Sequence, residues 1–230
     1  MKTEKSNPKD VSPAISTYLI AYNSLQTIGW SLIGLIIGQH LLGGTPQLTL
    51  YEASKTFLQI FQTAAILEVL HCIVGFVRSN PVLTAFQVAS RVFVVWGILH
   101  SVENTQASVG YTLLLAAWTI TEIIRYLYYV LNIAKIEAYP LVWLRYTLFI
   151  ILYPIGVTGE LTCIYQALPQ VAQTGLYSIK LPNKMNFAFD YQYALVLIML
   201  SYIPIFPQLY LHMFAQRKKI IGGAAKPKPE

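Results

Sequence analysis

Four long segments of this 230-residue chain contain no Asp, Glu, Lys or Arg: 11–51, 104–121, 146–159 and 191–216. A helix that crosses a bilayer needs about 20 mostly apolar residues. The whole chain is 55% apolar and only 11% charged, whereas a typical soluble domain is about 25% charged. These patterns exclude a soluble globular domain and leave no length for a separate soluble catalytic domain. Any function must lie within a membrane bundle or at its mouths.

The apolar segments and the breakers between them predict an all-α integral membrane protein with six transmembrane helices. The predicted spans are 18–42, 56–77, 82–100, 109–130, 141–165 and 191–214. Gly, Pro and Asn separate them, as at Asn80-Pro81 and Tyr139-Pro140. We expect a polar N-terminal tail (1–16), a six-span catalytic domain (17–216) and a basic, disordered tail (217–230). The alternating ten-residue segments of a β-barrel are not found.

The positions of Lys and Arg predict that both termini are cytoplasmic. That side then holds thirteen of the sixteen basic residues, namely Lys2, Lys5, Lys9, Arg78, Arg91, Arg125, Lys135, Arg145, Arg217, Lys218, Lys219, Lys226 and Lys228. The other side holds only Lys55, Lys180 and Lys184. Lys226 and Lys228 also resemble the dilysine retrieval signal of endoplasmic reticulum membrane proteins, with a solvated basic tail as the alternative.

Several ionisable residues fall inside the predicted spans, where a charge costs roughly 2.5–3.5 kcal/mol at mid-helix. Glu68 and His71 share one helix face, and so do Glu122 and Arg125, because residues three apart on a helix are neighbours. Two interpretations stay open. The charges either pair with one another and with Arg91 or Arg145 on neighbouring helices, or they serve a site. A metal site at Glu68 and His71 is the weaker interpretation.

The fifth span contains a carboxyl and a phenol seven residues apart, Glu160 and Tyr153. Seven residues bring two side chains back to one helix face, about 10 Å apart along the axis. Pro154 should kink the helix between them, and Gly156 and Gly159 leave room for a close helix or a substrate. A carboxyl and a phenol at membrane depth suit general acid–base catalysis. A buried hydrogen bond that only holds helices together is the alternative.

Residues 71–79 match the tyrosine-phosphatase signature His-Cys-x5-Arg-Ser, with Cys72 as nucleophile and Arg78 as phosphate clamp. That chemistry needs a loop whose backbone N–H groups face an oxyanion. The segment instead ends an apolar span, so its N–H groups should be bonded within a helix. We therefore interpret the match as coincidental.

Several strings together resemble one family. They are Leu67-Glu68-Val69-Leu70-His71, Gln87-Val88-Ala89-Ser90-Arg91, Glu122-Ile123-Ile124-Arg125-Tyr126, Leu144-Arg145-Tyr146, Leu152-Tyr153-Pro154-Ile155-Gly156 with Glu160, and Leu181-Pro182-Asn183-Lys184. The chain looks like a very-long-chain (3R)-3-hydroxyacyl-CoA dehydratase, a family also called protein-tyrosine-phosphatase-like. The resemblance implies a six-span enzyme of the endoplasmic reticulum membrane. It also implies Tyr153 and Glu160 as the catalytic pair.

The implied reaction is the third step of fatty-acid elongation, in which water is removed to give trans-2-enoyl-CoA. We expect Tyr153 to accept the C2 proton and Glu160 to protonate the C3 hydroxyl, and the reverse assignment stays open. Expected substrate-binding residues are Arg91, Glu122, Arg125, Arg145, Tyr146 and Gly156. Coenzyme A phosphates should lie at the basic cytoplasmic mouth, near Arg145 and Lys135 among others.

Expected partners are the long-chain 3-hydroxyacyl-CoA substrate, membrane lipid, and the condensing enzyme and reductases of elongation, with no nucleic acid. The chemistry requires no cofactor and no metal. The rival functions are a small transporter or channel, and a catalytically inactive scaffold or pseudophosphatase-like adaptor.

Overall fold

The computed structural model describes residues 12–44, 46–184 and 186–221, and in these ranges the protein is helical. The α-helices are α1 (Pro13–Gly43), α2 (Gln47–Ala64), α3 (Ile66–Ile73), α4 (Pro81–Phe93), α5 (Val109–Ile133), α6 (Tyr139–Arg145), α7 (Phe149–Thr174) and α8 (Tyr191–Ile221). A π-helical turn, η1 (Val94–Leu99), continues α4, and a 3-10 turn, η2 (Glu103–Thr105), precedes α5. Within the described ranges, β-pairing is confined to one isolated bridge, between Ile179 and Phe189.

Within the part of the chain that the structure describes, six helical segments are long and apolar enough to cross a membrane, which confirms the predicted number of spans. They are Pro13–Gly43, Thr49–Ile73, Pro81–Leu99, Val109–Ile133, Phe149–Thr174 and Tyr191–Ile221. The second span combines α2 and α3, which meet at Ala65.

The fifth span is displaced from its predicted limits. Residues 139–145 form the separate helix α6, with Pro140 in its first turn. Helix α7 starts at Phe149 and continues through Pro169 to Thr174, where Gly175 ends it in a left-handed conformation (φ 64°). Proline is tolerated inside transmembrane helices because neighbouring groups satisfy the freed backbone. Pro169 therefore does not end the helix, which extends nine residues beyond the predicted limit at residue 165.

The breakers of the sequence become helix caps. The Asn80 side chain accepts hydrogen bonds from the N–H groups of Val82 (2.9 Å) and Leu83 (3.3 Å), and Pro81 occupies the first turn of α4. The Ser108 hydroxyl similarly accepts from the Gly110 N–H at the start of α5 (2.9 Å). Such caps satisfy backbone donors that a helix start leaves unpaired.

The core of the bundle is the contact of α5 with α1 on one side and α7 on the other. A glycine of α7 makes its contact with α5 possible. A Cβ added to Gly159 would lie 2.5 Å from the Leu114 nitrogen and 2.7 Å from the Gly110 oxygen. Helix α7 therefore touches the backbone of α5 directly, as small residues allow in membrane bundles.

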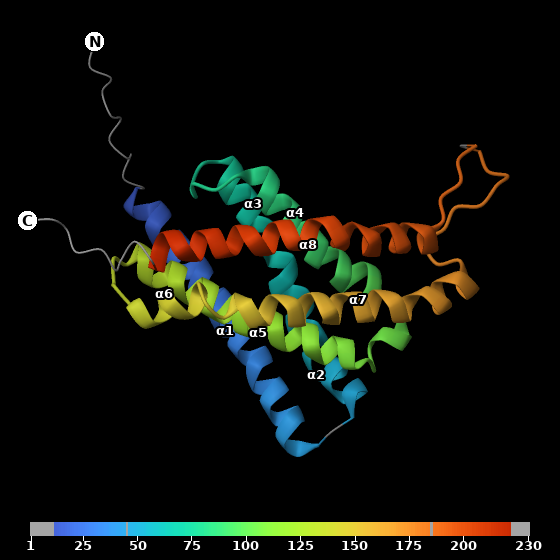
Figure 1. Ribbon diagram of the computed structural model, residues 1–230, viewed down its shortest axis with the longest axis horizontal. Helices are drawn as coiled ribbons and strands as arrows, with labels where there is room; N and C mark the ends of the chain where they lie inside the picture. The colour runs from blue at the N-terminus through green and yellow to red at the C-terminus, as the bar shows by residue number, and fades with distance from the viewer. Residues whose placement is uncertain (1–11, 45, 185, 222–230) are drawn as a thin grey trace, which may run out of the picture.

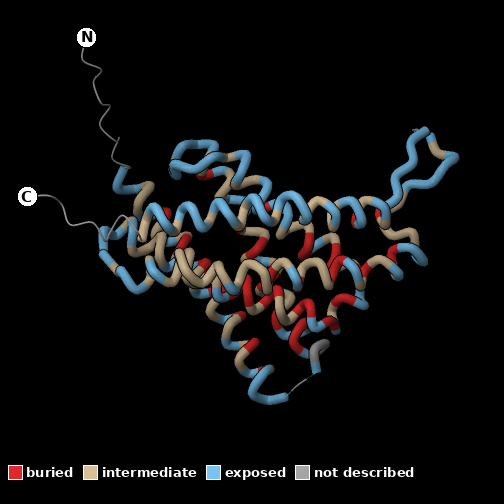
Figure 2. Tube along the Cα trace, viewed as in Figure 1, coloured by how far each residue is buried: buried red, intermediate tan, exposed pale blue. Residues whose placement is uncertain are grey.

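Helix α8 is the least enclosed of the candidate membrane spans. Only Tyr191 and Leu195 of its 31 residues are buried. It runs along α7 (Figure 1), and most of its trace is exposed or intermediate in burial (Figure 2). Helix α8 therefore has fewer contacts with α7 than α5 has.

Helix α1 begins and α8 ends at the same end of the molecule, where α6 and the turn between α3 and α4 also lie (Figure 1). We call this end, residues 13–18, 74–80, 133–148 and 217–221, the terminal face. The other end, the loop face, holds η2 and the segment between α7 and α8. The first five residues of the expected basic tail, 217–221, are part of α8. Lys226 and Lys228 lie outside the described residues.

Candidate active site

Glu160 is held from two sides by residues of other helices. Its Oε1 accepts a hydrogen bond from Trp118 Nε1 of α5 (2.9 Å), and its Oε2 accepts one from the Tyr202 hydroxyl of α8 (2.7 Å). These contacts bring α5, α7 and α8 together at one carboxyl group. Indole N–H can only donate, whereas a tyrosine hydroxyl can donate or accept. Glu160 can therefore keep both partners whether it carries a proton or not.

Tyr153 lies two turns before Glu160 on α7 and is stacked against α8. Its ring lies nearly parallel to those of Phe206 (centroids 5.1 Å apart, 6° between planes) and Tyr210 (6.0 Å, 11°). The ring is half-buried. No hydrogen bond to the Tyr153 hydroxyl is formed by the described residues, so the phenol is available to a substrate.

Pro154 connects this stack to the helix backbone. Because proline has no N–H, the Ile150 carbonyl loses its usual partner four residues along the helix. The Tyr210 hydroxyl of α8 donates to that oxygen at 2.8 Å. Tyr210 therefore compensates for the proline and packs on Tyr153 at the same time. Together with Tyr202, it fixes α8 beside both predicted catalytic residues.

The predicted pairing of charges within the bundle is confirmed for two arginines. Arg91 forms an ion pair with Glu122, and Glu122 also pairs with Arg125 (2.6 Å). Arg125 makes a two-pronged contact with Glu68 (2.8 and 2.9 Å), and Glu68 also accepts from the Tyr126 hydroxyl. This chain of charges crosses α3, α4 and α5, and Glu122 at its centre is buried.

His71 forms no direct hydrogen bond with Glu68 in the described residues, although the two share a helix face. Its Nε2 is hydrogen-bonded to the Tyr18 hydroxyl (2.9 Å). Among the described residues, no group of three or more His, Cys, Asp or Glu side chains could hold a metal ion.

Trp118 links the charge chain to Glu160. The Arg91 guanidinium lies over the Trp118 ring, 4.9 Å from its centroid, while the indole N–H donates to Glu160. Gly156 faces the same indole, and an added Cβ would be 3.8 Å from its Cδ1, an ordinary contact distance. Arg91 and Gly156 therefore lie against the indole that binds the predicted catalytic carboxyl, and Glu122 pairs with that arginine. Their role in substrate binding stays a prediction.

Arg145 and Tyr146 lie elsewhere, at the terminal face. Arg145 donates to the Tyr129 hydroxyl (3.2 Å) and lies 5.7 Å from the Tyr146 ring. Burial alone would lower the pKa of Arg145, but the hydroxyls of Tyr129 and Tyr146 raise this pKa above its ordinary value. The guanidinium stays charged. It is not beside Glu160, so any contact with substrate would be made at the mouth of the bundle.

The sequence prediction missed Trp118, Tyr202 and Tyr210. Trp118 lies four residues before Glu122, hence on the same face of α5, and this spacing could have indicated it. Tyr202 and Tyr210 lie in a long uncharged span, where no pattern distinguishes them from other aromatic residues. Only the packing of α8 on α7 reveals their contacts.

The phosphatase-like segment has no anion-binding loop. Helix α3 ends at Ile73, and the following N–H groups are bonded to backbone oxygens: Val74 to Leu70, Gly75 to Cys72, and Phe76 and Val77 to His71. The Cys72 sulfur lies 3.7 Å from the Thr84 hydroxyl. Because these N–H groups are occupied, the segment cannot surround a phosphate as a phosphatase loop does.

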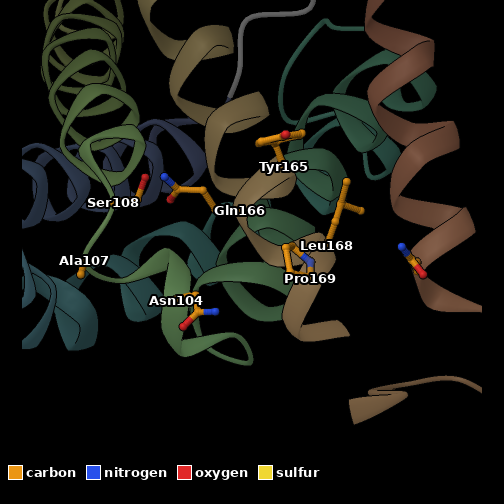
Figure 3. A pocket seen from close by; sticks show the side chains of 8 residues that line it. Asn104, Ala107, Ser108, Tyr165, Gln166, Leu168 and Pro169 are labelled. Atoms are coloured by element: carbon orange, nitrogen blue, oxygen red, sulfur yellow. The ribbon is translucent and has the colours of Figure 1, made fainter. Parts of the chain in front are cut away.

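Two open cavities lie away from Tyr153 and Glu160. One of about 540 Å³ is at the loop face, lined by Asn104, Ala107, Ser108, Tyr165, Gln166, Leu168, Pro169 and Gln192. Figure 3 shows Gln166 of α7 pointing toward Ser108 at the start of α5. A second, of about 470 Å³, is at the terminal face. Hydrogen-bond geometry, rather than cavity size, therefore makes the surroundings of Glu160 the candidate site.

The fold and the site define a multi-span helical membrane protein with a carboxyl and a phenol inside the bundle. The family model described as protein tyrosine phosphatase-like protein, PTPLA, matches residues 62–223. The chain is 51% identical over 214 residues to very-long-chain (3R)-3-hydroxyacyl-CoA dehydratase 2 of Mus musculus, covering 93% of this chain and 84% of that protein.

Two more distant relatives have related names. Very-long-chain (3R)-3-hydroxyacyl-CoA dehydratase hpo-8 of Caenorhabditis elegans is 48% identical, covering 94% of this chain and 99% of that protein. The dehydratase PASTICCINO 2 of Arabidopsis thaliana is 40% identical, covering 91% and 95%. No solved structure matches the chain. The chain belongs to the protein-tyrosine-phosphatase-like family of very-long-chain (3R)-3-hydroxyacyl-CoA dehydratases, which confirms the resemblance seen in the sequence.

Proposed function

We propose that this protein is a hydro-lyase that removes water from a long-chain (3R)-3-hydroxyacyl-CoA to give trans-2-enoyl-CoA, the dehydration step of fatty-acid elongation. The names of relatives that align over most of the chain support the reaction. The observation that carries the site is the position of Glu160. Its carboxyl is held inside the bundle by two donors, on the same helix as the unpaired Tyr153 phenol.

The reaction needs two proton transfers at neighbouring carbons. A base takes a proton from C2, the C2–C3 double bond forms, and the C3 hydroxyl leaves as water after receiving a proton from an acid. If Glu160 is the base and Tyr153 the acid, one turnover leaves a protonated Glu160 and a Tyr153 phenolate. Return of that proton from Glu160 to Tyr153 restores both groups, so the net change is the loss of one water.

The contacts favour this assignment over the reverse one expected from the sequence. Glu160 has two donors that stabilise a carboxylate, Trp118 Nε1 and the Tyr202 hydroxyl. No described residue donates a hydrogen bond to Tyr153 that would stabilise a phenolate. A hydrogen bond to a charged form favours that form. We therefore assign Glu160 as base and Tyr153 as acid.

The seam between α7 and α8 is the proposed entry to the site. Helix α8 is held there mainly by aromatic stacking and by hydroxyl contacts from Tyr202 and Tyr210. An acyl chain can lie along this apolar seam with its thioester near Glu160. Arg91 and Glu122, which support Trp118 from behind, would then position the catalytic carboxyl rather than touch the substrate.

The terminal face is proposed to be cytoplasmic. Its described residues include Arg78, Lys135, Arg145 and, at the end of α8, Arg217, Lys218 and Lys219, whereas the loop face has Lys180 and Lys184. Positive residues concentrate on the cytoplasmic side of membrane proteins. We place the protein in the endoplasmic reticulum membrane, surrounded by lipid and working with the condensing enzyme and the reductases of elongation.

Stereospecific turnover tests this function. Purified protein in detergent is given the (3R) and (3S) isomers of one long-chain 3-hydroxyacyl-CoA, and product is identified by mass spectrometry. We expect trans-2-enoyl-CoA from the (3R) isomer alone. If a folded sample converts neither isomer, the dehydratase proposal fails and the inactive scaffold becomes the better interpretation.

A further inference from the structure

Arg145 differs from the two arginines inside the bundle. Arg91 and Arg125 each pair with a carboxylate, but no described carboxylate lies within ion-pair distance of Arg145. Its guanidinium instead lies over the rings of Tyr128 (4.6 Å) and Tyr129 (4.8 Å). Its Nη1 is buried, and no described residue accepts a hydrogen bond from it. A buried cationic donor without an acceptor is unfavourable, and a bound anion would correct this.

Two further unpaired polar atoms lie at the same face. Thr147 Oγ1 and Arg217 Nε are both buried and lack a hydrogen-bond partner among the described residues. The rings of Phe149 and Phe214 meet at 5.1 Å, so Arg217, about one turn further along α8, is level with the segment just before α7. Arg145, Thr147 and Arg217, which we call the Arg145 cluster, each carry one buried polar atom without a partner, and the two arginines add two positive charges.

The cavity of about 470 Å³ adjoins this cluster, because the Tyr128 ring that lies under Arg145 also lines the cavity. Its other lining residues are Leu131, Asn132, Lys135, Ile136, Glu137, Ala138, Tyr139, Leu141 and Val142. Aromatic rings stack on nucleobases. An Asn amide and a Glu carboxylate can hydrogen-bond a base edge, and a Lys ammonium can bind phosphate. The lining therefore suits a nucleotide better than a lipid tail.

The separation from the catalytic residues fits a long, extended substrate. On α5, Tyr128 and Asn132 lie 10 and 14 residues beyond Trp118, which corresponds to about 15–21 Å of helix rise. The pantetheine arm of coenzyme A, which joins the diphosphate to the thioester sulfur, spans a comparable length when extended. A nucleotide bound in the cavity can therefore place its thioester beside Glu160.

We propose that this cavity and the Arg145 cluster bind the adenosine 3′-phosphate 5′-diphosphate portion of coenzyme A. The adenine lies against Tyr128 and Tyr139, the diphosphate lies at Arg145, and Lys135 contacts the 3′-phosphate. The inference rests on the proposed function, because that function supplies the coenzyme A thioester. The phosphate of an anionic lipid could also satisfy Arg145, but it would leave the aromatic and amide groups of the cavity unused.

A comparison of two thioesters tests the proposal. The same 3-hydroxyacyl chain is supplied either on coenzyme A or on N-acetylcysteamine, which has no nucleotide. We expect Arg145→Met to lower kcat/KM for the coenzyme A thioester at least tenfold more than for the N-acetylcysteamine thioester. Lys180→Met, which removes a charge at the loop face, should leave the preference unchanged. An equal loss for both thioesters would mean that Arg145 is structural, and no loss for either thioester would also overturn the proposal.

Binding measurements separate this inference from the proposed function. If the wild-type protein converts neither thioester, dehydration is wrong, and the affinity for unacylated coenzyme A decides the nucleotide site alone. We expect adenosine 3′,5′-bisphosphate to displace coenzyme A, and Arg145→Met to weaken coenzyme A binding at least tenfold. Absence of coenzyme A binding contradicts the site. Displacement by phosphatidic acid but not by the bisphosphate would instead assign the cluster to a lipid headgroup.

Discussion

Tyr202→Phe removes one hydroxyl and leaves the ring, so it isolates the 2.7 Å hydrogen bond to Glu160. A hydrogen bond to a charged group contributes about 1.5–3 kcal/mol. If Glu160 needs this bond in the transition state, kcat should fall about 10- to 100-fold. The KM should change little, because the hydroxyl contacts Glu160 and is not expected to contact the acyl chain.

The assay is steady-state formation of enoyl-CoA by purified variants in detergent. Tyr193→Phe is the matched control, because Tyr193 is on the same helix and its side chain is 70% exposed. It should behave as wild type. A kcat for Tyr202→Phe within twofold of wild type would refute the reasoning, since Glu160 would then be positioned without α8. A rise in KM alone would assign Tyr202 to substrate binding.

Three stability predictions follow from the same contacts. Glu122→Gln leaves Arg91 without its full charge partner and should lower the unfolding free energy by about 3–5 kcal/mol, measured by denaturation in detergent; a change below about 1 kcal/mol would argue against a tightly coupled pair. Gly159→Ala forces α7 away from α5 and should cost at least about 1–3 kcal/mol, whereas Gly38→Ala, with nothing within 4 Å of its added Cβ, should leave the melting temperature near that of wild type. Tyr210→Phe leaves the Ile150 carbonyl unpaired and should lower stability by about 1–3 kcal/mol; an unchanged melting temperature would show that the carbonyl freed by Pro154 needs no partner from α8.

The sequence was informative where a charge or a breaker interrupts an apolar run. The cost of burying Glu122 and Arg91 in a bilayer predicted that they would find partners, and they pair with each other. The helix start at Pro81 followed in the same way from Asn80, whose side chain can cap a helix.

Long apolar segments without charges were less informative. Hydropathy cannot show that Tyr202 faces Glu160, because this depends on how α8 rotates and shifts against α7. Hydropathy also misplaced the fifth span. Pro169 lies inside helix α7 without ending it, and Tyr139-Pro140 begins the short separate helix α6. Arg145 was expected to pair within the bundle or to bind substrate, and only its tyrosine surroundings show that it lacks a carboxylate partner.

The most direct test of the central claim is turnover of one long-chain (3R)-3-hydroxyacyl-CoA by wild type, Glu160→Gln and Tyr153→Phe, purified in parallel and matched for folding by circular dichroism. The proposed mechanism predicts trans-2-enoyl-CoA from wild type and a loss of at least about a hundredfold in each variant, as expected when a positioned acid or base is removed. Turnover by Glu160→Gln at more than a tenth of the wild-type rate would contradict it, because the carboxyl held by Trp118 and Tyr202 would then be only a structural contact.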